Sequence, residues 1–267
     1  MERSRSYRLD DPRHREAEIA RLLQQARVSF SLERAALAEH GLAGRKSLLD
    51  LGCGQASFLS LIAADFFGLR CAGADRNPGL LEVARGQPGV SEAVQCDLAD
   101  SAALTALLAR LEPDAVLCRF VLQHMSPPER QLLLRTLARH ASTRPMRIIL
   151  ADVDSDSSFF DPPSPLLALA QKNLVALQAR LGGDRRVGAK LGTILSEAGF
   201  REVKATRVCV DSREVGFGAW WKAFGAVIST GLLSQPTARE AVLEWGNDAA
   251  TAARWRAGFD VCYASAG

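Results

Sequence analysis

Short apolar segments alternate with segments of helical periodicity between residues 46 and 154. The apolar segments lie at residues 46–52, 69–76, 92–100, 114–120 and 146–154. The segments between them carry apolar residues at the spacing of an amphipathic helix. Strands that alternate with helices form βαβ units, whose parallel sheet is buried on both faces and is therefore built from nearly continuous apolar strands. The pattern predicts an α/β fold with five parallel strands.

Two more strands complete the predicted sheet. Residues 201–210 follow a further helical segment and are expected to form a sixth strand, and residues 258–267 a final strand that pairs with the sixth. The predicted fold class is therefore α/β, a Rossmann-like seven-stranded, mostly parallel sheet with helices on both faces and helical cap insertions. Six strands are expected to be parallel and the last antiparallel.

A glycine-containing turn follows the first predicted strand. The segment LLDLGCGQASF, residues 48–58, places Gly52 and Gly54 directly after a strand and ahead of a helix. Glycine at this turn lets the backbone approach a ligand closely. Asp75 ends the next strand, where a carboxylate can accept hydrogen bonds from both hydroxyl groups of a ribose. These features predict a nucleoside-binding site at the carboxyl edge of the sheet.

Two departures from the dinucleotide-binding pattern indicate which nucleoside this site prefers. Ser57 stands where the third glycine of G-x-G-x-x-G is expected, and Asp50 places a carboxylate at the strand tip beside the glycines. That carboxylate would repel a pyrophosphate, whereas it would attract a sulfonium ligand that carries an ammonium group. The sequence therefore predicts a cationic nucleoside.

Residues 50–54, Asp-Leu-Gly-Cys-Gly, resemble the Asp/Glu-x-Gly-x-Gly motif of the class I S-adenosylmethionine-dependent methyltransferases of the small-molecule type. The resemblance covers roughly residues 44–210. It implies S-adenosyl-L-methionine as cofactor, S-adenosyl-L-homocysteine as product, and binding positions for the methionyl, ribose and adenine parts. The implied cofactor-binding residues are Asp50, Gly52, Cys53, Gly54, Asp75, Arg76, Asp97, Leu98, Cys118 and Arg119.

The acceptor side of the site follows from the same resemblance. His124 comes just after the fourth strand and resembles a histidine that faces the acceptor pocket in small-molecule methyltransferases. Asp152 ends the fifth strand and matches an acid–base position of some natural-product O-methyltransferases. Methyl transfer is an in-line displacement that depends mainly on positioning, and histidine can remove a proton from a hydroxyl acceptor. We predict His124 as the catalytic base and Asp152 as its orienting residue or its alternate.

Structural alternatives exist for these side chains. His124 can simply hydrogen-bond a carbonyl group, Asp154 can equally be the functional carboxylate, and both aspartates can cap the helix that follows. Arg119 can neutralise the cofactor carboxylate or an acidic substrate, or it can pair with a nearby acid. For Asp50 and Asp75 the functional interpretation is stronger, because each belongs to a pattern of several parts.

The predicted domain boundaries are 1–42 for an N-terminal helical lid, 43–210 for the cofactor-binding core with an insertion at 155–185, and 211–267 for a helical cap segment and the final strand. Within the lid, one helix is expected to begin at Asp11 and Pro12, and a second to span residues 31–40. Arg21 and Gln25 resemble a pattern that closes over the cofactor in related enzymes, or they belong to a solvated helix face.

Two other segments carry specific expectations. The insertion begins with a turn-rich stretch at residues 155–165, and a long helix is expected to follow it. An aromatic cluster in the cap segment has helical spacing, which makes packing in the core its default role. The cluster consists of Phe217, Trp220, Trp221 and Phe224.

Charge, hydropathy and cysteine usage limit the partners. The net charge is +3 and the arginines are spread along the chain, whereas a polyanion-binding surface needs clustered basic residues. No apolar run approaches the roughly 20 residues that span a bilayer. The six cysteines include no CxxC pair, which argues against a zinc site or a disulfide framework and for buried thiols in a reducing compartment. We expect a cytoplasmic protein without a metal, a nucleic-acid partner or a membrane association.

The leading function is therefore methyl transfer to oxygen, nitrogen or carbon of a small-molecule acceptor, with specialised metabolism suggested by resemblance alone. One alternative keeps the same cofactor for other chemistry, such as cyclisation of the aminobutyrate chain of the cofactor or a substrate rearrangement. Another alternative is a non-catalytic module that uses the site for sensing or for binding a partner. Product analysis separates the first two, because methylation yields S-adenosylhomocysteine and cyclisation releases methylthioadenosine.

Overall fold

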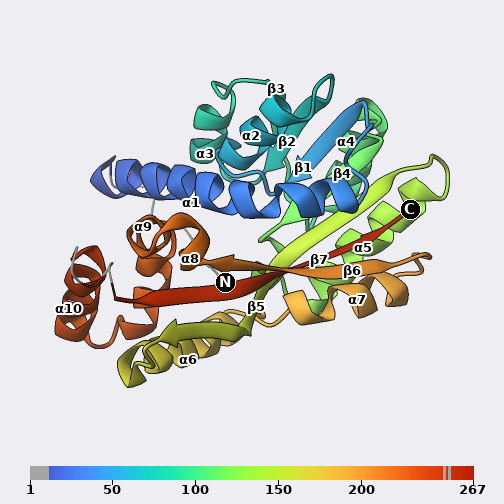
Figure 1. The fold of residues 1–267 in the computed structure, drawn as a ribbon. Coiled ribbons are helices and arrows are strands. Elements are labelled where there is room, and N and C mark those ends of the chain that lie inside the picture. The colour runs from blue at the N-terminus through green and yellow to red at the C-terminus, as the bar shows by residue number, and fades with distance from the viewer. Residues whose placement is uncertain (1–11, 249–250, 252–253) are drawn as a thin grey trace.

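A seven-stranded sheet with the strand order β3-β2-β1-β4-β5-β7-β6 forms the centre of the molecule (Figure 1). The computed structural model describes residues 12–248, 251 and 254–267. The strands are β1 (Ser47–Leu51), β2 (Arg70–Asp75), β3 (Val90–Gln95), β4 (Ala115–Arg119), β5 (Arg147–Asp161), β6 (Lys204–Asp211) and β7 (Arg256–Ala266). Strands β1 to β5 pair in parallel, and β7 runs antiparallel to both β5 and β6. The predicted fold class is confirmed, including the single antiparallel strand at the end of the chain.

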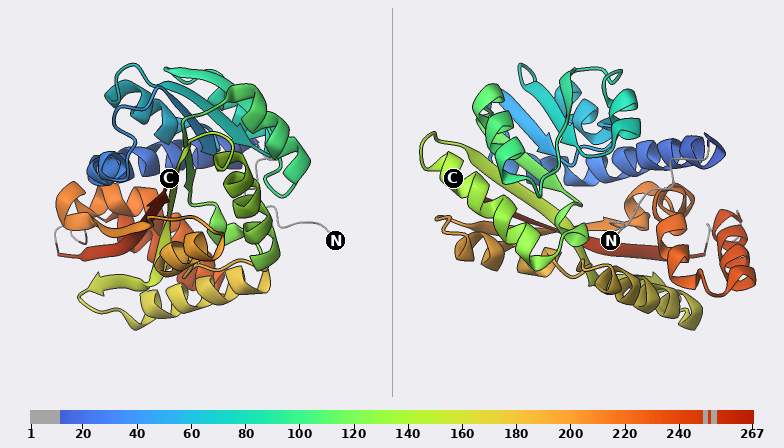
Figure 2. Two further views of the ribbon diagram at one scale, coloured as in Figure 1. Left: turned by 90° about the vertical axis from the view of Figure 1, so that its right-hand side faces the viewer. Right: turned by 180° about the vertical axis from the view of Figure 1, so that it is seen from behind.

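Helices cover both faces of this sheet, as Figure 2 shows from two further sides. The helices are α1 (Pro12–Glu39), α2 (Ser57–Asp65), α3 (Pro78–Ala84), α4 (Ser101–Leu111), α5 (Pro127–Ala141), α6 (Pro165–Arg180), α7 (Leu191–Glu197), α8 (Ser212–Val215), α9 (Phe217–Ser229) and α10 (Pro236–Asn247), with short 3-10 turns η1 (Leu122–His124), η2 (Gly188–Lys190) and η3 (Thr230–Leu232). Successive strand residues point to opposite faces. Leu48 joins the core under α1 and α2, while Leu49 joins the core under α4 and α5.

The N-terminal helix differs from its prediction. Two helices were expected, with the second at residues 31–40, but α1 runs without interruption from Pro12 to Glu39. No glycine or proline follows Pro12 within this segment, so nothing breaks its ladder of backbone hydrogen bonds. The expected N-cap residue, Asp11, lies outside the described residues.

The start of the predicted insertion is also different. The stretch at residues 155–165 was expected to be turn-rich, but β5 continues through it to Asp161 and pairs with the beginning of β7. Phe159 lies opposite Gly258, and the register shifts between Asp154 and Phe159. The serine and aspartate residues that favour turns therefore lie in an irregularity of a long strand, which β7 holds in place. The helix expected after this stretch is confirmed as α6.

The C-terminal aromatic cluster is part of the core, as predicted. Trp220 and Trp221 are almost completely buried, and the Trp220 Nε1 group donates a hydrogen bond to the Val210 carbonyl oxygen at 2.9 Å. The rings of Trp220 and Phe224 lie 5.3 Å apart. In Figure 1, helices α9 and α10 lie near α6, beyond the end of the sheet where β5 finishes and β7 begins.

Four of the six cysteines, at positions 71, 96, 118 and 262, are buried as expected, and Cys53 is half-buried. Cys209 is exposed, contrary to the expectation, because it lies on β6 at the edge of the sheet. All six are free thiols. Among the described helices, none combines the length and the hydrophobicity needed to cross a lipid bilayer.

Candidate active site

The loop between β1 and α2 lies at the carboxyl edge of the sheet. Gly52 and Gly54 both adopt positive φ angles, 77° and 57°. A Cβ atom on Gly52 would lie only 2.3 Å from Cγ2 of Val121, which belongs to the segment after β4. A Cβ atom on Gly54 would meet only Leu80 Cδ1, at 3.9 Å. Gly52 therefore allows the loops after β1 and β4 to pack closely, while Gly54 supplies a backbone conformation that other residues rarely adopt.

Asp75 organises this edge. Its Oδ2 atom accepts a hydrogen bond from the backbone N–H of Gly54 at 2.9 Å, and its Oδ1 atom accepts one from the backbone N–H of Asn77 at 2.8 Å. One carboxylate thus joins the loop after β1 to the turn after β2. Each oxygen of an ionised carboxylate keeps further acceptor capacity, so Asp75 can also accept hydrogen bonds from ribose hydroxyl groups.

Asp50, near the end of β1, is 5% exposed. Burial raises the pKa of its carboxyl group to about 7; the positive charge of Arg119 lowers this pKa and the negative charge of Asp75 raises it further. Within the part of the chain that the structure describes, no hydrogen bond reaches the Asp50 carboxyl group. A buried carboxylate without a partner is costly. This position therefore fits a ligand that brings a positive charge, as S-adenosylmethionine does.

Arg119 joins the end of β4 to the N-terminal helix. Its Nε and Nη2 atoms donate to the Glu33 carboxylate at 2.9 and 2.6 Å, and the hydroxyl group of Tyr263 donates to the same carboxylate. The guanidinium lies 4.0 Å from the ring centroid of Phe58 and 3.9 Å from that of Phe120. Of the roles considered for Arg119, pairing with a nearby acid is the one seen in the structure. Its contact with the cofactor stays a prediction.

Of the two cysteines of the predicted cofactor site, Cys118 is buried and Cys53 is half-buried. Cys118 is completely buried in the core on the α4 and α5 face, and burial raises the pKa of its thiol. A Cβ atom on Gly73 would lie 2.6 Å from the Sγ atom of Cys53, so the thiol packs against β2. Both thiols therefore pack against neighbouring strands, and their contact with the cofactor stays a prediction.

The predicted adenine side lies at the ends of β2 and β3. Arg76 is exposed, and its carbonyl oxygen accepts a hydrogen bond from Gln95 Nε2 at 3.2 Å. Asp97 is half-buried and accepts a hydrogen bond from the Ala99 backbone N–H at 3.0 Å. Leu98 is buried in the core on the α4 face. The structure therefore brings Arg76 and Asp97 to the same edge as Asp75.

His124 ends the short turn η1 after β4 and is half-buried. Burial lowers the pKa of its imidazole to about 4, and the positive charges of Arg185 and Arg76 lower it further. The ring is therefore neutral at pH 7 and has a nitrogen that can accept a proton.

Asp152 is completely buried, and burial raises the pKa of its carboxyl group to about 7. Its oxygens accept hydrogen bonds from the backbone N–H groups of Gln123, at 3.0 Å, and Val153, at 2.8 Å. Among the described residues, no hydrogen bond joins Asp152 to the ring of His124. Asp152 therefore fixes the backbone beside His124 and does not contact the imidazole directly.

The structure adds a loop that the sequence did not single out. In the segment between α6 and η2, Arg185 donates to Gln123 Oε1 at 3.0 Å and to Ser155 Oγ at 3.2 Å. The Asp184 backbone N–H donates to the Gln123 carbonyl oxygen at 2.9 Å. A Cβ atom on Gly183 would lie 2.1 Å from that oxygen. The sequence shows a Gly-Gly turn after a helix, but nothing in it indicates which strand end the turn contacts.

Helix α1 contacts the glycine loop and α9. Gln55 Nε2 donates to the Ile19 carbonyl oxygen at 2.9 Å. Arg21 donates to Gln25 Oε1 at 2.9 Å and to the Ala223 carbonyl oxygen in α9 at 3.2 Å. The solvated-face alternative for Arg21 is therefore wrong, because its side chain is only 11% exposed and lies between two helices.

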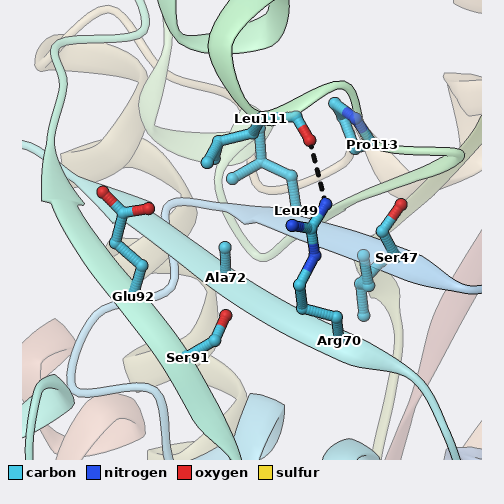
Figure 3. Close-up of a pocket in the computed structure, with 9 residues that line it drawn as sticks. Ser47, Leu49, Arg70, Ala72, Ser91, Glu92, Leu111 and Pro113 are labelled. Carbon is cyan, nitrogen blue, oxygen red and sulfur yellow. Dashed lines mark hydrogen bonds between the residues drawn. The ribbon is translucent and has the colours of Figure 1, made fainter.

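Two cavities lie at the opposite, amino edge of the sheet. The smaller one, drawn in Figure 3, is about 40 Å³ in volume and is lined by the starts of β1, β2 and β3; Arg70 donates there to the Leu111 carbonyl oxygen at 3.2 Å. The larger one is about 500 Å³ and open, with Lys46 and Arg144 in its wall. Ligands of open α/β sheets bind at the carboxyl ends of the strands, so neither cavity belongs to the candidate site. No cluster of three metal-binding side chains occurs in the described residues.

Comparison with known proteins gives one matching family and many solved structures of similar fold. Residues 48–143 match the family described as a methyltransferase domain. The chain is similar to phosphoethanolamine N-methyltransferase 2 of Haemonchus contortus in complex with S-adenosyl-L-methionine, with a TM-score of 0.53, 14% identity, and coverage of 98% of this chain and 60% of that chain. It is also similar to human N-acetylserotonin methyltransferase in complex with SAM, with a TM-score of 0.52, 17% identity, and coverage of 74% and 53%. Comparison with curated proteins gives no match.

At these identities the structural likeness shows the fold alone, and this chain spans little more than half the length of those two proteins. The family match is independent of it and contains Asp50, Gly52, Gly54 and Asp75, the residues that the structure brings together at the carboxyl edge. The matched domain and the fold agree with the motif. Residues 48–143 therefore form a methyltransferase domain, and the fold and the motif agree with the resemblance to class I S-adenosylmethionine-dependent methyltransferases.

Proposed function

We propose that this chain transfers a methyl group from S-adenosylmethionine to oxygen, nitrogen or carbon of a small-molecule acceptor, in specialised metabolism. The observation that carries the proposal is the Asp50 carboxyl group, which is buried beside the glycine loop and near Asp75 with no hydrogen bond from the described residues. The ammonium group of the cofactor would supply a hydrogen-bond donor, and the ammonium and sulfonium charges would add to the positive charge of Arg119.

The chain's own residues account for the rest of the binding. The backbone at Gly54, which has open space around it, contacts the methionyl part, and Asp75 accepts hydrogen bonds from the ribose. When bound, the cofactor supplies an electrophilic methyl group that passes to a lone pair of the acceptor as the carbon–sulfur bond breaks. His124, neutral and at the same edge, accepts the proton that a hydroxyl or amine acceptor releases.

The surroundings of the site support a small acceptor. Helix α1 contacts the glycine loop through Gln55 and the end of β4 through Glu33. The loop after α6 contacts the segment of His124 through Gln123. A site enclosed on several sides by the chain's own helices and loops suits a small molecule better than a macromolecule.

Calorimetric titration with S-adenosylmethionine and S-adenosylhomocysteine tests the proposal. Both ligands should bind the wild-type chain, and Asp75→Ala and Asp50→Asn should each weaken S-adenosylmethionine binding about tenfold or more, the effect of losing a charge-assisted contact. Asp65→Asn is the matched control, because Asp65 pairs with Arg34 at the end of α2 and faces no part of the site. Folded wild-type protein that binds neither ligand would refute the proposal.

A further inference from the structure

The amino edge of the sheet, opposite the candidate active site, carries an open cleft of about 500 Å³. Sites for small molecules have volumes of about 300–1,000 Å³, so the cleft is large enough to hold one. Its charged side chains are four cations and two acids, namely Lys46, Arg70, Arg110, Arg144, Glu112 and Asp114. Such a surplus of positive charge favours an anionic occupant.

Two of the four cations are already paired with carboxylates. Arg144 Nη1 lies 2.7 Å from Glu112 Oε2 within the wall of the cleft. Arg110 Nη2 lies 2.8 Å from Oε1 of Glu92, which lines the smaller neighbouring cavity. In the described part of the chain, the other two cations of the wall form no ion pair of this kind. These two are therefore the side chains that an anion would meet.

Lys46 and Arg70 lie side by side where β1 and β2 begin, and both are exposed. The backbone N–H of Arg70 donates a hydrogen bond to the carbonyl oxygen of Lys46 at 2.9 Å. The Arg70 guanidinium donates to the carbonyl oxygen of Leu111, the last residue of α4, at 3.2 Å (Figure 3), and this bond uses one of its five N–H donors. Within residues 12–248, 251 and 254–267, no hydrogen bond or ion pair reaches the Lys46 ammonium group. Both side chains therefore keep donors for a ligand.

The acid Asp114 offsets only part of this charge. Its two carboxylate oxygens accept hydrogen bonds from the backbone N–H groups of Lys46 and of the next residue, each at 2.9 Å. Arg45 Nη1 donates to the Asp114 carbonyl oxygen at 3.4 Å and adds another cation at this edge. Burial and then the positive charge of Arg45 lower the pKa of Arg147, whereas Glu202 raises it. Cations therefore crowd this edge, and a bound anion would reduce their repulsion.

We propose that this cleft binds a small anion that carries a phosphate group, which contacts Lys46 and Arg70 together. The inference is independent of the proposed function, because the cleft lies at the edge of the sheet opposite the cofactor and acceptor sites. The two side chains recognise phosphate in complementary ways. The arginine fork forms paired, charge-assisted hydrogen bonds with its oxygens, and the lysine ammonium group acts as a point charge.

Titration of the complete chain with inorganic phosphate, followed by backbone-amide NMR, tests this site. The amide signals of residues 46–47, 70 and 111–112 should shift saturably, and those of residues 52–55 should not. Lys46→Gln and Arg70→Gln should each weaken binding about tenfold, the effect of losing one charge-assisted contact. Added salt should weaken binding too, because both contacts are exposed.

Glu112→Gln provides a test of the opposite sign. It removes an acid from the wall and releases Arg144 from its pair, so phosphate should bind about threefold more tightly, the size of an exposed charge effect. Lys172→Gln is the matched control, because it removes an exposed lysine of α6 that does not line the cleft, and it should leave the affinity unchanged.

A second titration with adenosine monophosphate separates two sources of the phosphate group. Tighter binding than that of inorganic phosphate, with shifts of the same amides, would identify a phosphate ester as the ligand, whereas equal or weaker binding would identify free phosphate. No saturable shift of the cleft amides with either probe would overturn the proposal. Equal losses of affinity in Arg70→Gln and Lys172→Gln would also overturn it, because they would show attraction to the surface charge in general.

Discussion

Asp50 on β1 and Asp152 on β5 are both buried carboxyl groups, and burial raises the pKa of each to about 7. Their surroundings differ. Asp152 accepts two backbone hydrogen bonds, from Gln123 and Val153, so its carboxyl group is satisfied within the fold. Asp50 accepts none from the described residues and lies near Asp75 and the glycine loop. Asp152 therefore holds the backbone in place, and Asp50 is available to a ligand.

This difference predicts a pH dependence of cofactor binding. Because the pKa of Asp50 is about 7, the group is largely neutral below that pH and cannot attract the ammonium group of the cofactor. Affinity for S-adenosylmethionine should therefore rise as the pH increases from about 6 to about 8, and level off above it. Calorimetry across this range measures the slope.

Two substitutions assign the slope to one carboxyl group. Asp50→Asn should flatten the pH profile, whereas Asp152→Asn should keep it, although Asp152 has a pKa in the same range. A wild-type affinity that does not change with pH, or a slope that survives in Asp50→Asn, would contradict the role given to Asp50.

At the scale of elements, α1 is attached to the sheet along its length. Gln55 donates to the Ile19 carbonyl oxygen near its beginning, and Glu33 pairs with Arg119 towards its end. His40, just after the helix, makes hydrogen-bonding contacts with Ser265 at 2.8 Å and with Thr206 at 2.7 Å. The segment predicted as a lid is thus anchored at several points, and one face of the site is built by it.

Removing the Glu33 anchor should destabilise the whole fold. The side chains of Glu33 and Arg119 are 0% and 9% exposed, so Glu33→Gln would leave a buried guanidinium without its counter-charge. Breaking a buried pair in this way costs about 3–5 kcal/mol. Urea denaturation should show that loss for Glu33→Gln and about 0–1 kcal/mol for Arg34→Gln, which removes an exposed pair from the same helix. Equal effects of the two substitutions would argue against a buried anchor.

The glycine loop gives a second prediction at this scale. Gly52→Ala would place a Cβ atom 2.3 Å from Val121, so the loops after β1 and β4 must separate. We expect S-adenosylmethionine affinity to fall about tenfold or more. Gly44→Ala is the control, since Gly44 has a similar φ angle of 79° and no atom within 4 Å of the added Cβ position. The double change Gly52→Ala with Val121→Ala should restore part of the affinity, and a Gly44→Ala variant that binds as weakly as Gly52→Ala would contradict the steric argument.

The sequence predicted the strands well where both faces of the sheet are buried, because such strands need a short run of apolar residues. Strand residues such as Leu48 and Leu49 are buried on opposite faces, so each parallel strand is a short apolar run. The prediction was wrong at residues 155–161, where serine and aspartate favour a turn locally and the pairing of Phe159 with Gly258 decides for a strand. That pairing depends on β7, which lies far away in the sequence.

At the scale of the whole molecule, the strand order brings the ends of β1, β2 and β4 side by side (Figure 1). Asp50 and Asp75 were predictable because a local motif and the strand ends fix their positions. The contact of Arg119 with Glu33, and that of Arg185 with Gln123, were not, because they join residues 86 and 62 positions apart through the topology. Local sequence motifs therefore determine the positions of Asp50 and Asp75, whereas the contacts of Arg119 and Arg185 depend on the complete fold.

The proposed function is the transfer of a methyl group from S-adenosylmethionine to a small acceptor at this edge of the sheet. The most direct test is to incubate the chain with S-adenosylmethionine and a set of small hydroxyl, amine and carbon nucleophiles, and to quantify all products by mass spectrometry. We expect S-adenosylhomocysteine and a methylated acceptor in equal amounts, with both lost in Asp75→Ala. Methylthioadenosine as the sole product, or no S-adenosylhomocysteine from folded wild-type protein, would contradict it.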